Sequence, residues 1–172
     1  MEAQMIRFLP AILALCGCAA LALADPIKKA PAVDADKLAK ECADAFIKAL
    51  LDGKVDDGMK LCATPFRDHD GNKLDNLDKF KRDFERPPPA GIEVKVGEPI
   101  ELSKLNAFLK KMELKELDAD TIKQYEEFTG KDGRIVMLEL KGNGAPPPGD
   151  SPPHMLIRVK DGKAHIVGVG GR

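Results

Sequence analysis

The segment ECADAFIKALLDGKVDDGMKLC, residues 41–62, decides the fold because it joins two helical patterns through a turn and carries two cysteines. Apolar residues recur at helical spacing over residues 38–50, so this part predicts an amphipathic helix. Gly53 ends that helix, and a shorter helix is expected to follow with Cys62 on its apolar face. If the two helices fold back antiparallel, Cys42 and Cys62 lie at similar heights on facing sides.

These two cysteines are open to two interpretations. The other two, Cys16 and Cys18, lie in a predicted export signal, so Cys42 and Cys62 would remain as a pair in an oxidising compartment. A disulfide between them would stabilise the fold by about 3 kcal/mol in the chain-entropy estimate. Alternatively, they are buried free thiols that pack as small apolar side chains.

Residues 1–24 have the pattern of a signal peptide. Arg7 supplies a positive charge, an apolar run follows, and small residues end the segment at Ala24. We therefore predict export, to the periplasm or outside the cell, with cleavage after Ala24. Lipid attachment at Cys18 is the second interpretation, and a retained membrane anchor is the third.

The remaining chain predicts one domain. Residues 25–33 contain two prolines and no periodicity, which indicates a flexible leader, and residues 34–172 are enough for one core. The net charge is −1, and Lys and Arg are mixed with Asp and Glu throughout. No basic face is evident, so nucleic acid is not an expected partner.

Patterns of apolar residues and turn signals predict an α+β domain, with N-terminal helices packed on a mostly antiparallel sheet. The further elements that they predict are a hairpin or loop at 64–76, a helix at 77–84, a strand at 92–102 with a bulge, a helical insertion at about 103–128, a strand at 134–141 and a hairpin at 154–171.

The last hairpin predicts its own register. With Asp161-Gly162 as a two-residue turn, Ile157 pairs with Ile166 and His154 faces Val169. One face is then apolar and must be the core side; it carries Met155, Ile157, Val159, Ala164, Ile166 and Gly168. The other face carries His154, Arg158, Lys160, Lys163 and His165 together with Leu156, Val167 and Val169. This outer face is apolar enough to suggest a homodimer that covers it.

His69 is the one candidate acid-base residue. It lies in the loop DHDGN, residues 68–72, where the alternate acidic positions resemble the start of a calcium loop. An EF-hand loop needs glycine at its sixth position and glutamate at its twelfth, but Lys73 and Lys79 stand there. A turn with an exposed histidine is the simpler interpretation.

No metal or cofactor site is predicted. In the register above, His154 and His165 are roughly 13 Å apart along the sheet, too far to hold one ion. Two cysteines alone do not make a structural zinc site, which normally takes four ligands. No nucleophile motif or phosphate-binding loop is present, so no catalytic residue is assigned.

The order of these elements resembles the nuclear transport factor 2-like superfamily. The resemblance covers residues 34–170 and rests on the long helix, on PFRDHDGNKLDNLDKFKRDF (65–84) and on LIRVKDGKAHIVGVG (156–170). It implies a cystatin-like α+β cone, in which a curved antiparallel sheet wraps the long helix. Ala164 stands where members commonly carry an aromatic residue, and residues 103–128 look like an insertion.

The resemblance leaves the function open. Enzymes of the superfamily, such as polyketide cyclases and steroid isomerases, place acid-base residues inside the cone, but none is carried onto this chain. If the cone holds a pocket, Phe46, Phe66, Phe84 and Met155 are its expected wall; otherwise they fill the core.

We predict an exported, non-catalytic binding or interaction domain whose partner is a protein or a small apolar ligand. The alternative is a small-molecule enzyme of isomerase, cyclase or hydrolase type that uses the cone interior. A structural component of the cell envelope is a third interpretation.

Overall fold

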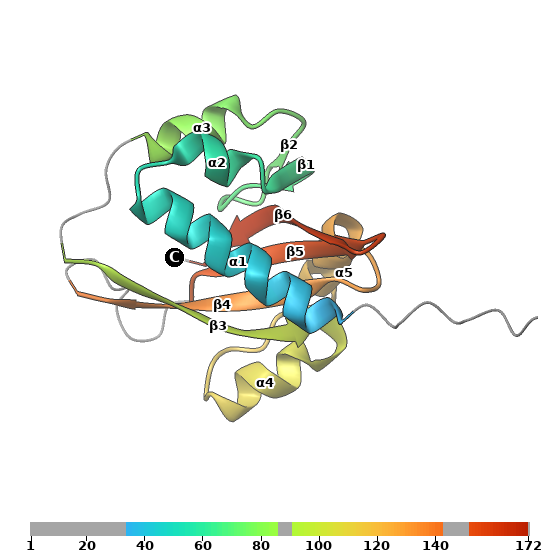
Figure 1. Cartoon of the computed structure of the whole chain (residues 1–172). Helices are drawn as coiled ribbons and strands as arrows, with labels where there is room; N and C mark the ends of the chain where they lie inside the picture. Colours follow the sequence, from blue (N-terminus) through green and yellow to red (C-terminus); the bar gives the residue numbers. More distant parts are fainter. Residues whose placement is uncertain (1–33, 86–90, 143–151, 172) are drawn as a thin grey trace, which may run out of the picture. The chain divides into compact units, whose positions relative to one another are not determined.

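The computed structural model describes residues 34–85, 91–142 and 152–171, which form one sheet with helices on both of its faces (Figure 1). The helices are α1 (Ala35–Leu51), α2 (Val55–Met59), α3 (Asp78–Phe84), the 3₁₀ helix η1 (Leu102–Lys104), α4 (Leu105–Lys111) and α5 (Ala119–Thr129). The strands are β1 (Cys62–Arg67), β2 (Lys73–Leu74), β3 (Glu93–Glu101), β4 (Arg134–Lys141), β5 (His154–Lys160) and β6 (Lys163–Gly170). The predicted signal peptide and leader lie outside the described residues.

Helix α1 forms where the apolar stripe predicts it. The side chain of Asp34 caps its first turn by accepting a hydrogen bond from the backbone N–H of Lys37, at 3.1 Å. Gly53, with φ of 73°, turns the chain after the helix. The buried side of α1 carries Ala39, Cys42, Ala43 and Phe46. Figure 1 shows this helix lying across the sheet.

The strands of the described residues are ordered β2-β1-β6-β5-β4-β3. Strands β1 and β6 are parallel, and every other neighbouring pair is antiparallel. A bulge between Val96 and Pro99 bends β3, as the sequence predicts. The predicted fold class, α+β with N-terminal helices on a curved and mostly antiparallel sheet, is confirmed.

The terminal hairpin keeps the predicted register only near its turn. Ile157 pairs with Ile166 as expected, but a bulge between Leu156 and Ile157 shifts the pairing beyond that point. His154 therefore faces Gly170, and the predicted pairing with Val169 is wrong. Because of this shift, Val169 packs in the core under α1, where the uninterrupted register placed Gly168.

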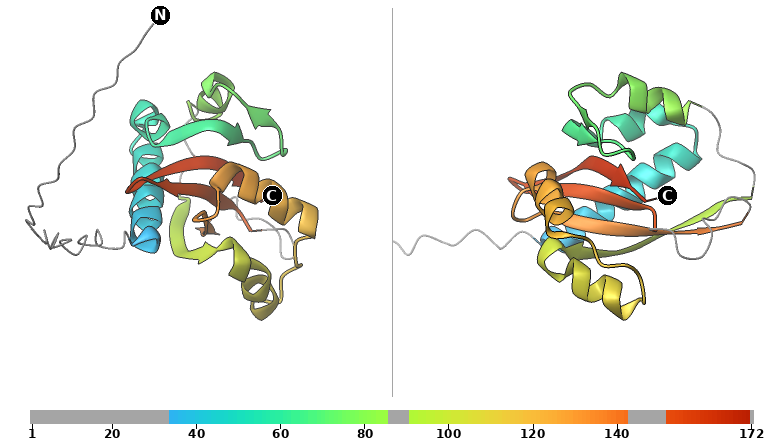
Figure 2. Two further views of the ribbon diagram at one scale, coloured as in Figure 1. Left: turned by 90° about the vertical axis from the view of Figure 1, so that its right-hand side faces the viewer. Right: turned by 180° about the vertical axis from the view of Figure 1, so that it is seen from behind.

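Two apolar clusters lie on opposite faces of the sheet. The first lies between α1 and the strands and includes Phe46, Phe66, Met155 and Ile166. The second lies on the outer face, beneath α4 and α5. Figure 2 shows α1 and α5 on opposite sides of the strands.

The predicted helical insertion supplies this outer cover. Leu156 and Val167, two apolar residues of the outer face, are fully buried in one cluster with Leu105 of α4 and Tyr125 of α5. Leu156 and Val167, whose apolar side chains suggest a second subunit, are thus covered by helices of the same chain. A homodimer through this face stays a prediction.

The insertion consists of two helices, α4 and α5, joined by a short segment. Helix α4 ends near Met112, and Glu113 has a positive φ of 57°. Asn106 holds the connecting segment by exchanging two hydrogen bonds with the backbone of Leu117, at 2.8 and 2.9 Å. Gly130 ends α5 as expected.

Cys62 does not lie on the second helix, so that expectation is wrong. Helix α2 ends at Met59, and Cys62 is the first residue of β1, where it pairs with Ile166. The parallel ladder accounts for this, since Ile166 N–H donates to the carbonyl of Leu61 at 2.9 Å. Cys62 still packs against the same core as Cys42, and both carry free thiols.

Among the described residues, no helix has the length and apolar character needed to cross a membrane.

Candidate functional site

The predicted pocket residues Phe46, Phe66, Phe84 and Met155 all pack in the core under α1. Phe46 and Phe84 meet edge to face with ring centroids 6.1 Å apart. Three of the four have at most 1% of their surface exposed, and Phe84 is half-buried. These side chains fill the space between helix and sheet, which is the second of the two roles that the sequence allows them.

His69 lies at the surface. Its side chain is 49% exposed, and its Nε2 is 3.2 Å from a carboxylate oxygen of Asp70. The buried member of this loop is Asp68, which accepts hydrogen bonds from the backbone N–H groups of Asp70 and Asn72, at 3.0 and 2.8 Å. Burial raises the pKa of Asp68. The hydrogen bonds from the two backbone N–H groups and from the Asn72 side chain outweigh burial, so the pKa is lowered overall. The loop is built as a turn around Asp68.

A buried polar pair that sequence reasoning missed joins α5 to the sheet. The hydroxyl of Tyr125 lies 2.9 Å from Nε2 of His154, and each residue is 4% exposed. Nδ1 of His154 is 3.0 Å from the carbonyl of Pro152. A carbonyl only accepts, so Nδ1 carries the proton and Nε2 accepts from the tyrosine O–H. No motif marks this pair, because the two residues are far apart in the sequence.

Burial governs the titration of both members of this pair. It lowers the pKa of His154; the hydrogen bond to Pro152 opposes this shift, and the positive charge of Arg67 adds to it. Burial raises the pKa of Tyr125, and Arg67 opposes that change. The guanidinium of Arg67 lies 5.0 Å from the centre of the Tyr125 ring, a cation–π distance. At neutral pH the pair is uncharged and closed to solvent.

An apolar groove lies next to this pair, between α4 and strands β3 and β4. We call it the α4 groove. It has a volume of about 330 Å³ and is lined by Lys95, Gly97, Phe108, Met112, Leu114, Met137, Leu138, Glu139 and Pro152. Met112, one of two large apolar side chains that are exposed in the described chain, is 55% exposed here.

Two backbone features lie at the walls of the groove, Gly97 in β3 and the end of α4. A β-carbon at Gly97 would lie 2.9 Å from the carbonyl oxygen of Met137, so glycine is required for the close approach of β3 to β4. From the α1 side, the ammonium group of Lys40 donates to the carbonyls of Val96 and Gly97, at 2.5 and 3.2 Å. At the other wall, the left-handed Glu113 ends α4 and leaves Met112 at the groove edge.

The polar groups of the groove are at its rim. Lys95 and Glu139 are paired residues of β3 and β4, and their charged ends are 3.7 Å apart and mostly exposed. The Tyr125–His154 pair lies behind the wall, since His154 pairs with Met137 in the sheet and donates to Pro152. The two charged side chains of the groove are thus solvated, and the Tyr125–His154 pair behind its wall is bonded internally.

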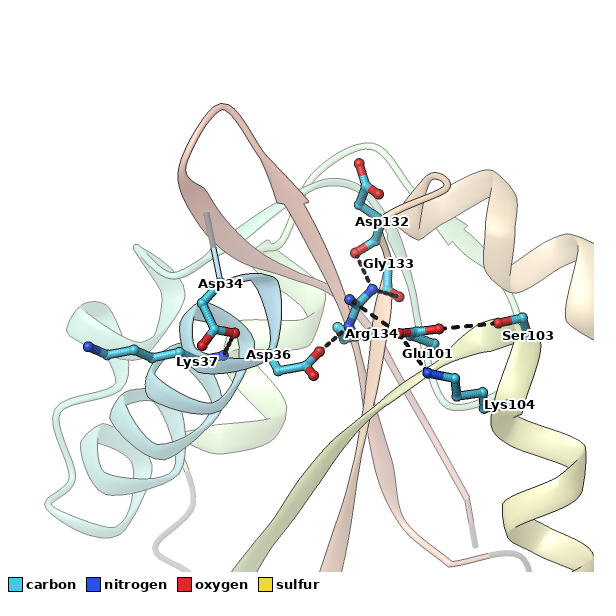
Figure 3. Close-up of polar contacts among 9 residues, drawn as sticks. All are labelled: Asp34, Asp36, Lys37, Glu101, Ser103, Lys104, Asp132, Gly133 and Arg134. Atoms are coloured by element: carbon cyan, nitrogen blue, oxygen red, sulfur yellow. Dashed lines mark hydrogen bonds and ion pairs between the residues drawn. The ribbon is translucent and has the colours of Figure 1, made fainter. Parts of the chain in front are cut away.

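A second, polar groove surrounds Arg134 and has a volume of about 430 Å³. The guanidinium of Arg134 contacts the carboxylates of Asp36 and Glu101 and the carbonyls of Asp132 and Gly133 (Figure 3). The hydrogen bond from Lys104, the largest influence, lowers the pKa of Glu101. Because Arg134 is already bound on several sides, this cluster ties the start of α1 to the sheet and leaves little of the cation for a ligand.

Among the residues that the structure describes, no group of three or more His, Cys, Asp or Glu is placed to hold a metal ion.

No protein-family model and no curated protein sequence matches the chain. Solved structures do match. An NTF2-like protein from Cytophaga hutchinsonii has 10% identity and a TM-score of 0.40, over 78% of this chain and 88% of that one. An NTF2-like protein from Burkholderia xenovorans has 13% identity and a TM-score of 0.43, over 79% and 82%. A proposed ketosteroid isomerase from Kribbella flavida has 11% identity and a TM-score of 0.43, over 79% and 77%. The chain is similar in structure to NTF2-like proteins, as its sequence pattern predicts, and likeness at this level carries no argument about activity, ligand or partner.

Proposed function

We propose that this protein is an exported, non-catalytic binding domain that takes a small apolar ligand in the α4 groove. One observation carries the proposal: the groove has about 330 Å³ of space, an apolar wall and an opening to solvent. Ligand sites commonly fall between about 300 and 1,000 Å³ and are lined mainly by apolar side chains.

The side chains of the groove suit an apolar guest. Phe108, Met112 and Met137 offer one aromatic ring and two thioethers, and methionine adapts easily to ligands of irregular shape. A ligand that removes roughly 300 Å² of apolar surface from water gains about 7 kcal/mol. Association costs reduce this figure, so we expect micromolar or weaker binding.

The geometry favours binding over catalysis. An enzyme of isomerase or hydrolase type needs a polar group that reaches the reacting atoms of its substrate. The buried polar pair nearest to the groove, Tyr125 and His154, is 4% exposed and satisfied internally. His69, the predicted acid-base candidate, is 49% exposed and does not line this groove. Export, with cleavage after Ala24 or lipid attachment at Cys18, remains part of the proposal.

The test is a fluorescence titration of the purified protein with 1-aminoanthracene, an uncharged apolar probe. We expect saturable binding that Met112→Gln weakens by about fivefold to tenfold, because the variant removes roughly 50 Å² of apolar contact. Leu51→Gln is the matched control, since Leu51 is the other exposed large apolar side chain among the described residues and does not line this groove. Absence of saturable binding, or equal weakening by both variants, would overturn the proposal.

A further inference from the structure

The thiols of Cys42 and Cys62 lie in one cluster between α1 and β6. The Sγ of Cys42 is 3.5 Å from the carbonyl oxygen of Ala164. Cys62 pairs with Ile166, two residues further along the same strand. The two cysteines therefore flank one short stretch of β6, although they come from a helix and a different strand.

Cys62 also contacts the end of α2, which lies beside α1. The Sγ of Cys62 is 3.8 Å from the carbonyl oxygen of Gly58. A β-carbon built on Gly58 would lie 3.6 Å from the ring of Phe46, which is one turn along α1 from Cys42. Both cysteines thus pack against one core cluster, beside neighbouring residues of β6.

We infer that Cys42 and Cys62 form a disulfide while the chain folds, and that the finished core then shields this bond between α1 and β1. The inference rests on the predicted export, which supplies the oxidising compartment. It does not depend on the α4 groove, whose lining includes neither cysteine.

The chemistry needs an oxidant with a disulfide, such as oxidised glutathione. The thiolate of one cysteine attacks that disulfide, forms a mixed disulfide and releases one glutathione thiol. The second cysteine then attacks the mixed disulfide, closes the protein bond and releases the other glutathione. Two protein thiols are oxidised, and one disulfide is reduced to two thiols.

Timing follows from burial. In the folded, reduced protein, burial raises the pKa of Cys42 to about 11 and that of Cys62 to about 12, where the charge of Cys42 adds to the effect. Since the thiolate is the reacting form, very little of either residue reacts at neutral pH. In the unfolded chain both thiols are exposed and have ordinary pKa values, so oxidation is fast only before the core closes.

The experiment compares two starting states of the reduced protein in one buffer that contains oxidised and reduced glutathione. In one arm the protein refolds from urea, and in the other it is already folded. Samples are quenched with an alkylating reagent, and intact mass and a tryptic map locate the bond. We expect the Cys42–Cys62 link in most refolded molecules, and formation at least tenfold slower in the folded arm.

Two variants serve as controls. Cys42→Ala should give no link to Cys62 in either arm. Cys42→Ala combined with Cys62→Ala should keep the circular dichroism spectrum of the fold, and its unfolding equilibrium constant should exceed that of the oxidised protein by roughly 100-fold. Unlinked cysteines after refolding, or equal rates in the two arms, would overturn the inference.

Discussion

His154 should make the stability of the domain depend on pH between about 7 and 5. Its ordinary pKa is 6.5, and burial lowers that value in the folded protein. Below pH 6.5 the unfolded chain therefore binds a proton that the folded protein does not bind. The free energy of unfolding falls as the pH falls, until the pH reaches the folded pKa.

The size of this effect follows from the linkage relation. One such group changes the free energy of unfolding by up to about 1.4 kcal/mol per pH unit. Between pH 7 and pH 5 the loss is then up to about 2 kcal/mol. Protonation of Nε2 would also remove the acceptor of the Tyr125 O–H. The loss of this hydrogen bond disfavours the charged form of His154 in the folded protein. Asp68, whose pKa is lowered, contributes stability that is lost only under more acidic conditions.

Urea unfolding at several pH values measures this slope. The chain has no Trp, so far-UV circular dichroism is the suitable signal. His154→Gln should flatten the dependence between pH 7 and 5, whatever its own stability at pH 7. Leu51→Gln, an exposed substitution that removes no titratable group, should keep the wild-type slope. The same slope in His154→Gln and in wild type would refute the assignment to His154.

Four further substitutions, one of them a control, test the packing and the groove. Tyr125→Phe leaves Nε2 of His154 without its donor and should cost about 1–3 kcal/mol in urea unfolding; a loss below about 0.5 kcal/mol would contradict the pairing. Phe46→Ala, at a side chain 1% exposed, should cost about 3–5 kcal/mol, whereas Leu51→Ala, at one 45% exposed, should cost less than about 1 kcal/mol; equal losses would count against the core. Gly97→Ala places a β-carbon 2.9 Å from a β4 carbonyl, so it should lower the melting temperature; an unchanged melting temperature would show that this approach tolerates a side chain.

Local patterns predicted the elements well, since each depends on neighbouring residues. The apolar stripe of residues 38–50 predicted α1, and the Asp161-Gly162 turn predicted the last hairpin. The pairing beyond Ile157 was not predictable, because a bulge has no signal in alternating apolar residues. The placement of Cys62 on a helix is wrong because three apolar residues at helical spacing, Val55, Met59 and Cys62, cannot outweigh a strand that pairs with β6.

The candidate site was largely beyond prediction from the sequence. The α4 groove combines residues of two strands and a helix end, with Gly97 in one wall and Met112, before the left-handed Glu113, in the other. The sequence predicts a bulge in residues 92–102, but it gives no sign that Gly97 lines a groove. The Tyr125–His154 pair depends on how α5 docks on the sheet, which no local spacing encodes.

The location of the ligand site can be measured through the methionine methyl groups. In a protein labelled with ¹³C at these methyls, titration with 1-aminoanthracene should shift the signals of Met112 and Met137, which line the α4 groove. The signals of Met59 and Met155, which pack in the core under α1, should stay in place. Shifts at Met59 and Met155 with none at Met112 and Met137 would place the ligand inside the cone and contradict the account.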